Sequence, residues 1–132
     1  MNRRLFLKVG IFSAGALTLP LLHCRSKKQY NDLLQQPSLL SQICDEKTLR
    51  EIGIAYRKLK PDEDKLMPLI NFLSVESGGE KINSKSSDSE VNIFIDNKIH
   101  TDFENNDTII VKGWILAHTE ARQCALLSLT LQ

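Results

Sequence analysis

The chain has 132 residues, of which 42% are hydrophobic and 25% are charged. Its 17 basic and 16 acidic side chains give a formal net charge of +1. A chain of this length can bury one hydrophobic core but is short for two domains. Because the charges balance and form no extended basic face, the composition argues against nucleic acid as a partner.

The first residues have the organisation of an export signal. A basic start precedes an apolar run, residues 9–22, that contains no acid and is shorter than the roughly 20 apolar residues of a membrane-spanning helix. The order of residues 2–8 resembles the bacterial twin-arginine signal, Ser/Thr-Arg-Arg-any-Phe-Leu-Lys, and departs from it only at Asn2. The matching residues are Arg3, Arg4, Phe6, Leu7 and Lys8. The resemblance implies that the twin-arginine export machinery carries the folded protein to the periplasm or cell envelope. An amphipathic N-terminal helix is the alternative.

A cysteine follows the apolar run at the point where a signal would be removed. Leu21-Leu22-His23-Cys24 resembles the lipoprotein box of bacteria, although His23 stands where Gly, Ala or Ser is usual. The resemblance implies that Cys24 receives lipid and anchors the protein to a membrane. An uncleaved signal anchor and a free periplasmic protein are the alternatives. We assign residues 1–23 to the signal peptide, 24–36 to a tether and 37–132 to a single domain.

Two segments of this domain have the spacing of amphipathic helices. Between Asp45 and Leu59, apolar residues recur every three or four positions, with Asp45 as a capping residue and Pro61 beyond the end. A second stripe covers residues 66–73 and includes Pro68. Proline is tolerated in the first turn of a helix, so this helix either begins near residue 65 or is kinked.

The second half of the domain predicts a helix, a hairpin and a final buried helix. Residues 77–90 are rich in Ser, Gly and charge and predict a surface connection, ending in a capping box from Ser87 to Glu90. The following residues fit a helix or a strand, and residues 108–117 fit a short strand or hairpin. Thr119 is the expected cap of a last helix that is apolar nearly all round. The fold class is thus mainly α, a small helical domain with one short strand or hairpin.

The remaining cysteines, Cys44 and Cys124, have two interpretations. In an oxidising compartment they could form a disulfide, whereas their apolar neighbours also fit two buried, reduced core residues. The chain lacks the paired Cys and His spacing of haem, iron–sulfur or structural zinc sites. We therefore predict no cofactor for this chain alone.

Two segments carry a resemblance to a protein family. Residues 52–64 and 102–129 resemble small, mostly uncharacterised bacterial proteins with a twin-arginine signal, an Ile-Gly-x-Ala-Tyr segment and a terminal Gly-Trp-x-Leu-(Ser/Ala)-x-Thr-Glu-Ala-Arg-x-Cys-Ala-Leu signature. The motifs imply membership of that family and assign no catalytic residue. In size, signal and helical content only, the chain is also similar to the small twin-arginine subunits of membrane-bound gluconate and sorbitol dehydrogenases.

The best candidate for a ligand or partner contact is the polar string of His118, Glu120 and Arg122 beside Trp114. A junction between a strand and a helix can present such side chains and free backbone N–H groups to an anion. In the alternative interpretation Thr119 caps the helix, Glu120 complements its dipole and Arg122 pairs with an acid elsewhere.

Other chemistry has weaker support. His100 with Asp96, Asp102 and Glu104 has helical spacing that could imitate a metal site, but an acid-rich solvated face is commoner, so we predict no metal. Tyr56 and Trp114 are expected to be core residues with partnered polar tips. The chain has no nucleophile elbow, phosphate loop or dinucleotide fingerprint. Enzyme activity by this chain alone is therefore not expected.

These observations leave three functional hypotheses. The leading one is an exported envelope accessory subunit or assembly factor for a larger, flavin-bearing oxidoreductase that uses the same export route. The second is a small stand-alone periplasmic ligand-binding protein or enzyme that uses His118, Glu120 and Arg122. The third is a structural lipoprotein anchored through Cys24.

Overall fold

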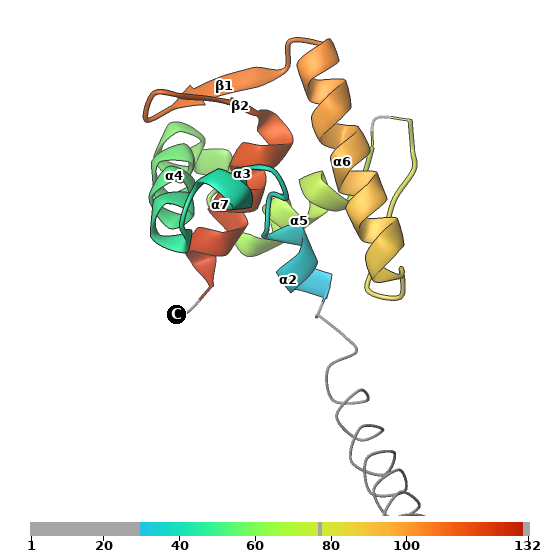
Figure 1. Cartoon of the computed structure of the whole chain (residues 1–132). Helices are drawn as coiled ribbons and strands as arrows, with labels where there is room; N and C mark the ends of the chain where they lie inside the picture. The colour runs from blue at the N-terminus through green and yellow to red at the C-terminus, as the bar shows by residue number, and fades with distance from the viewer. Residues whose placement is uncertain (1–29, 77, 131–132) are drawn as a thin grey trace, which may run out of the picture.

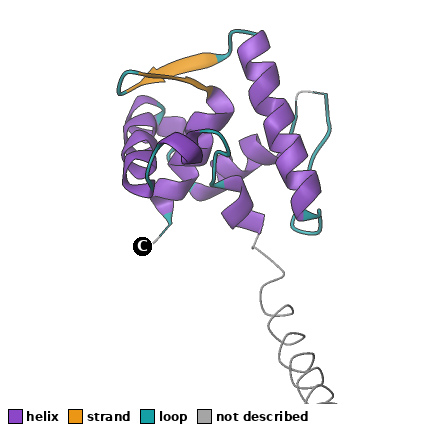
Figure 2. Cartoon of the chain, in the orientation of Figure 1, coloured by secondary structure: helices purple, strands orange, loops and turns teal. Residues whose placement is uncertain are grey.

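The computed structural model describes residues 30–76 and 78–130 (Figure 1). The twin-arginine signal and Cys24 lie outside the described residues, so the predictions made for them are untested. The described chain is mainly helical and contains a small antiparallel two-stranded sheet (Figure 2). This confirms the predicted fold class, a single small helical domain with a hairpin.

The last helix lies in the middle of the domain. Helices α4, α5 and α6 surround α7, and the β1–β2 hairpin lies across one end (Figure 1). The elements are α2 (Tyr30–Leu34), α3 (Leu40–Ile43), α4 (Glu46–Leu59), the 3-10 helix η1 (Pro61–Glu63), α5 (Leu66–Ser74), α6 (Asp88–Glu104), β1 (Thr108–Val111), β2 (Trp114–Ala117) and α7 (His118–Leu129).

The predicted boundaries of the middle helices are confirmed at their first turns. The Asp45 side chain accepts a hydrogen bond from Thr48 N at 2.8 Å, which caps α4. Pro68 lies in the first turn of α5. N–H groups in a first turn have no acceptor within the helix, so the N–H that proline lacks is not needed there. Ser87 and Glu90 form the capping box of α6, which settles the choice between helix and strand in favour of a helix.

The hairpin has one face against the core and one face in solvent. Lys112 and Gly113 both have positive φ, 51° and 83°, as a tight two-residue hairpin turn requires. Val111 and Leu116 are 1% and 2% exposed on the inner face. On the outer face Ile110 and Ile115 are cross-strand partners and are 66% and 67% exposed.

Helix α7 is buried on nearly every side, as predicted, and α4 approaches it through a glycine. A Cβ atom placed on Gly53 would lie 2.0 Å from the carbonyl oxygen of Cys124 and 2.9 Å from Ala125 N. No side chain fits this space, so the two helix backbones are in direct contact. The contact allows α4 to cover the apolar surface of α7 along its length.

The structure corrects the boundary of the predicted tether. Residues 30–34 form α2 rather than an extended tether, and Leu34 is fully buried. The Tyr30 hydroxyl lies 2.5 Å from Ser74 Oγ and donates to the carbonyl oxygen of Ile82 at 3.3 Å. The packed domain therefore already includes residue 30, and the assignment of 24–36 to a tether is wrong for its second half.

None of the helices within residues 30–76 and 78–130 has the length and apolar character needed to cross a membrane.

A substitution at Gly53 tests the close packing of α4 against α7. Alanine normally stabilises a helix relative to glycine, but Gly53→Ala would place a methyl group against the α7 backbone. We expect it to lower the free energy of unfolding by about 2–3 kcal/mol or more in urea titrations. Gly78→Ala is the matched control, because its Cβ would meet no atom within 4 Å. A Gly53→Ala protein as stable as the parent would contradict this packing.

Candidate functional site

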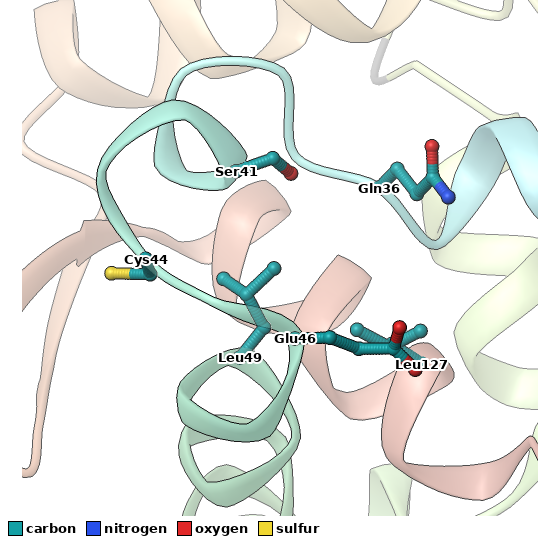
Figure 3. Close-up of a pocket in the computed structure, with 6 residues that line it drawn as sticks. All are labelled: Gln36, Ser41, Cys44, Glu46, Leu49 and Leu127. Carbon is teal, nitrogen blue, oxygen red and sulfur yellow. The ribbon is translucent and has the colours of Figure 1, made fainter. Parts of the chain in front are cut away.

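A pocket of about 240 Å³ lies between the α2–α3 connection, the start of α4 and the end of α7 (Figure 3). Its lining residues are Gln36, Ser41, Cys44, Glu46, Leu49 and Leu127. The Ser41 hydroxyl donates to the carbonyl oxygen of Pro37 at 2.5 Å, and Glu46 pairs with Arg50 at 2.8 Å. These polar groups are thus engaged within the fold, and Cys44 is the one predicted site residue that lines this pocket.

Cys44 and Cys124 are free thiols in the structure, so the disulfide that the sequence allows is not formed. Cys124 is fully buried, as the reduced alternative predicts, whereas Cys44 is half-buried and its sulfur is turned away from Gln36 and Leu127 (Figure 3). Burial raises the pKa of the Cys124 thiol to about 12, and the charges of Glu120 and Cys44 act in the same direction. A thiol that stays protonated at neutral pH is a poor nucleophile.

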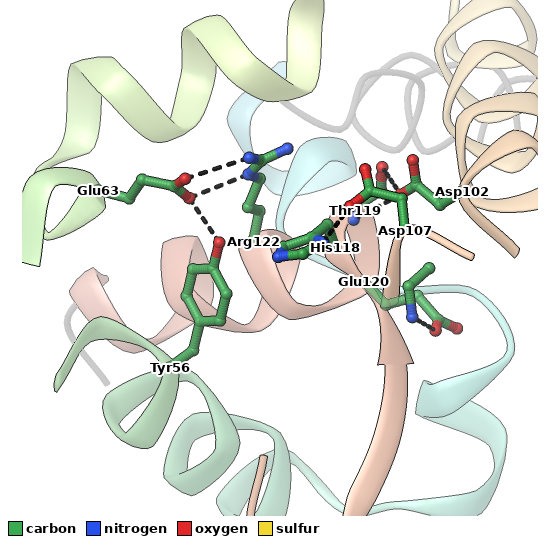
Figure 4. Close-up of polar contacts among 9 residues, drawn as sticks. Tyr56, Glu63, Asp102, Asp107, His118, Thr119, Glu120 and Arg122 are labelled. Atoms are coloured by element: carbon green, nitrogen blue, oxygen red, sulfur yellow. Dashed lines mark hydrogen bonds and ion pairs between the residues drawn. The ribbon is translucent and has the colours of Figure 1, made fainter. Parts of the chain in front are cut away.

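The N-terminus of α7 is capped by a residue from another helix. Helix α7 begins at His118, so Thr119 lies inside its first turn and the prediction that Thr119 is the cap is wrong. The backbone N–H and the hydroxyl of Thr119 both donate to Asp102 Oδ2, at 2.8 and 2.6 Å. Asp102 belongs to α6, and its carboxylate therefore takes the place of the side-chain acceptor that Ala117 lacks (Figure 4).

Glu120 folds back onto the same helix end. Its Oε2 accepts a hydrogen bond from Ala117 N at 3.0 Å, and the side chain lies in the first turn, where a negative charge complements the helix dipole. Burial raises the pKa of the Glu120 carboxyl, the Ala117 N–H opposes that rise, and the charge of Asp102 adds to it. The position of Glu120 and its bond to Ala117 N agree with the helix-dipole interpretation, but burial outweighs them and disfavours the charged form.

Arg122 points in another direction, toward η1 and α5. Its Nε and Nη2 donate to the two carboxylate oxygens of Glu63 at 3.0 and 3.1 Å, and the Tyr56 hydroxyl donates to Glu63 Oε2 at 2.6 Å (Figure 4). The guanidinium carbon lies 4.3 Å from the centroid of the Phe72 ring. Only 17% and 12% of the Arg122 and Glu63 side chains are exposed. The interpretation that Arg122 pairs with an acid elsewhere is therefore correct.

The three polar groups of this cluster shift one another's protonation. Burial alone would raise the pKa of Glu63, but the hydrogen bonds from Arg122 and Tyr56 outweigh it and hold that pKa below its usual value. Burial and the hydrogen bond to Glu63 raise the pKa of Tyr56. The cluster is thus a neutral phenol and a paired guanidinium around one ionised carboxylate, an arrangement suited to holding α4, η1 and α7 together.

His118 lies between this cluster and the chain that follows α6. Its Nδ1 is 2.5 Å from Asp107 Oδ1. Its ring meets the Tyr56 ring edge-on, with 6.5 Å between centroids. The other ring nitrogen is turned toward the side of Tyr56 and Arg122 (Figure 4). A carboxylate-oriented imidazole can accept a proton, but among the described residues no hydroxyl or thiol is hydrogen-bonded to this ring.

The predicted contact residues therefore do not converge on one space. His118 and Arg122 both border Tyr56, Glu120 lies on another side of α7 (Figure 4), and the half-buried Trp114 packs against the core from β2. Sequence reasoning missed Glu63 and Asp107 as partners. Both stand in acidic or polar stretches with no periodic signal, and only the fold brings them to α7.

The acidic side chains of α6 also have separate partners rather than a common site. His100 pairs with Glu104 at 3.1 Å, Asp96 accepts a hydrogen bond from Ser38 at 3.0 Å, and Asp102 caps α7. Over residues 30–76 and 78–130, no three His, Cys, Asp or Glu side chains are arranged to hold a metal ion.

Comparison of the chain with models of known protein families, with characterised proteins and with solved structures finds no match. A functional proposal therefore rests on the residues of this chain.

The capping role of Asp102 predicts a specific loss of stability. Asp102→Ala removes the one acceptor of both Thr119 hydrogen bonds, so we expect the free energy of unfolding to fall by about 1–2 kcal/mol in urea titrations. Asn97→Ala, an exposed substitution on the same helix, controls for helix propensity. Equal stability of the two variants would show that Asp102 does not hold α7.

We expect the contributions of Glu63 and Glu120 to the stability of the fold to depend on pH in opposite directions. The depressed native pKa of Glu63 gives stability that is complete above its unfolded value of 4.5 and is lost as pH falls through the native pKa. The raised native pKa of Glu120 means that stability is lost as pH rises from 4.5 through the native value.

We therefore expect Glu63→Gln to cost about 2–3 kcal/mol at neutral pH and to flatten the acid limb of the stability profile. Glu120→Gln, which keeps an acceptor for Ala117 N, should be at least as stable as the parent at neutral pH. Urea titrations between about pH 3 and 7 measure both profiles. If the two variants have the same profile, the assigned environments of the carboxylates are wrong.

Proposed function

We propose that the protein is an exported accessory subunit or assembly factor of the cell envelope, and that its partner is a larger, flavin-bearing oxidoreductase. The twin-arginine pattern at Arg3 and Arg4 supports this proposal, because that route carries proteins that are already folded. A small chain without a cofactor motif has a reason to use the route if it crosses the membrane together with a cofactor-bearing protein.

The observation that carries the proposal is the outer face of the hairpin. Ile110 and Ile115 lie opposite each other on adjacent strands and expose two-thirds of their surface. Each strand of the described sheet also has one edge without a neighbouring strand. A two-stranded hairpin with an apolar outer face is a favourable site for a partner to add a strand or to pack a surface.

The ligand-binding alternative is less well supported by the geometry. It requires His118, Glu120 and Arg122 to face a common ligand, but each is held by a different acid or backbone group. Their contacts join α7 to its neighbours, which is a structural role. Interaction through the surface is therefore the function that the arrangement favours.

The hairpin predicts a specific loss of partner binding. We expect the full chain, tagged and extracted from its own envelope in mild detergent, to co-purify in a fixed ratio with a protein that shows flavin absorbance. The double variant Ile110→Asp and Ile115→Asp should reduce the co-purified flavoprotein about tenfold or more, since interface centres carry most of the binding free energy.

Ile93→Asp provides the control, because Ile93 is 61% exposed on α6 and lies outside the hairpin. It should leave the amount of bound flavoprotein unchanged. A parent chain recovered with no flavoprotein would count against the proposed function itself, and equal losses in both variants would count against the hairpin as the contact.

A further inference from the structure

Helix α5 has an apolar outer face that is largely exposed, although the Arg122 guanidinium lies over the Phe72 ring at one side of it. Met67 is 61% exposed, Val75 just beyond the helix end 45%, and Phe72 44%. Asn71 is the exposed polar side chain among them, and Leu69 and Leu73 point into the core. The helix is therefore apolar nearly all round, which is unusual for a helix at a protein surface.

The C-terminal end of α5 lies next to the point where the described chain begins. The Tyr30 hydroxyl meets Ser74 Oγ, at the C-terminal end of α5, at 2.5 Å. Only five residues separate Tyr30 from Cys24 in the sequence. Even fully extended, this stretch spans about 20 Å. A lipid on Cys24 would thus hold the end of α5 within about 20 Å of the bilayer surface.

We propose that the outer face of α5, formed by Met67, Asn71, Phe72 and Val75, lies on the lipid surface of the membrane to which the chain is anchored. The inference goes beyond the proposed function and rests on the lipid anchor at Cys24 that the sequence predicts. It adds a second contact to that anchor, one that fixes the orientation of the domain. A single lipid chain binds membranes weakly, and such a second contact makes attachment stable.

Two sets of basic groups near this face can meet a lipid surface. Arg25, Lys27 and Lys28 lie between Cys24 and the domain, where they can meet anionic headgroups. At the C-terminal end of α5, Lys98 Nζ donates to the carbonyl oxygen of Val75 at 2.9 Å. Basic groups therefore lie both in the connecting chain and beside the apolar face.

The size of the face argues against a second copy of the chain as its occupant. A nine-residue helix is about 14 Å long and about 10 Å wide, so one side presents on the order of 150 Å². A stable protein interface needs about 800 Å² from each partner. A small apolar face can instead add to an existing lipid anchor, because the anchor already holds it at the membrane.

The test places a tryptophan at the centre of the face. Asn71→Trp and the control Asn97→Trp, an exposed amide on α6, are each made in a Trp114→Phe background, which removes the only native tryptophan. The full chain, processed in its own envelope, is reconstituted into vesicles of phosphatidylethanolamine and phosphatidylglycerol with brominated acyl chains. Fluorescence quenching by bromine and flotation with the vesicles are measured together.

We expect the tryptophan introduced at position 71 to be blue-shifted and quenched about threefold more strongly than that at position 97, because an interfacial helix buries its apolar side 5–10 Å deep. Protein that floats but shows equal, weak quenching at both positions would overturn the inference and leave the anchor standing. A blue shift at position 71 that disappears on dilution, without bromine quenching, would assign the face to a second copy. Protein that does not float overturns both the anchor and the inference, and flavoprotein co-purification then tests the accessory role separately.

Discussion

The backbone contact between α4 and α7 at Gly53 is the constraint on which the rest of the domain depends. It lies within the most extensive helix pair of the core, in which α4 covers one side of α7 while α5 and α6 cover others. A side chain at this position would separate the helices and leave the apolar surface of α7 partly uncovered. The glycine of the Ile-Gly-x-Ala-Tyr segment therefore has a packing role, and its tyrosine donates a hydrogen bond to Glu63.

The polar residues at the start of α7 form hydrogen bonds and ion pairs that join α7 to neighbouring elements. Asp102 ties α6 to the first turn of α7, and Glu63 ties η1 to Arg122 and Tyr56. Partly buried charges are costly without partners, so each is matched by an opposite charge or by hydrogen-bond donors. What reads along the chain as a reactive polar string is, in three dimensions, three separate connections.

The domain combines this engaged polar interior with exposed apolar side chains, two groups of which lie on the hairpin and on α5. The outer face of the hairpin and the outer face of α5 each expose large side chains, which is where a soluble monomer usually places polar groups. The hairpin lies at one end of α7 and α5 ends beside Tyr30, so the two faces are available to different occupants (Figure 1). A protein held at a membrane on one face and bound to a larger subunit on another fits this division.

The sequence left open whether Pro68 lies in a first turn or kinks its helix, and whether residues 108–117 form one strand or a hairpin. By itself it determined the Asp45 cap, the Ser87 capping box and the burial of the last helix. These features depend on residues a few positions apart, so spacing reveals them. Only the tertiary structure decided that Asp102 caps α7, that Glu63 receives Arg122, and that the domain already includes residue 30. Those contacts join residues distant in sequence, and no local pattern encodes which acid reaches which helix end.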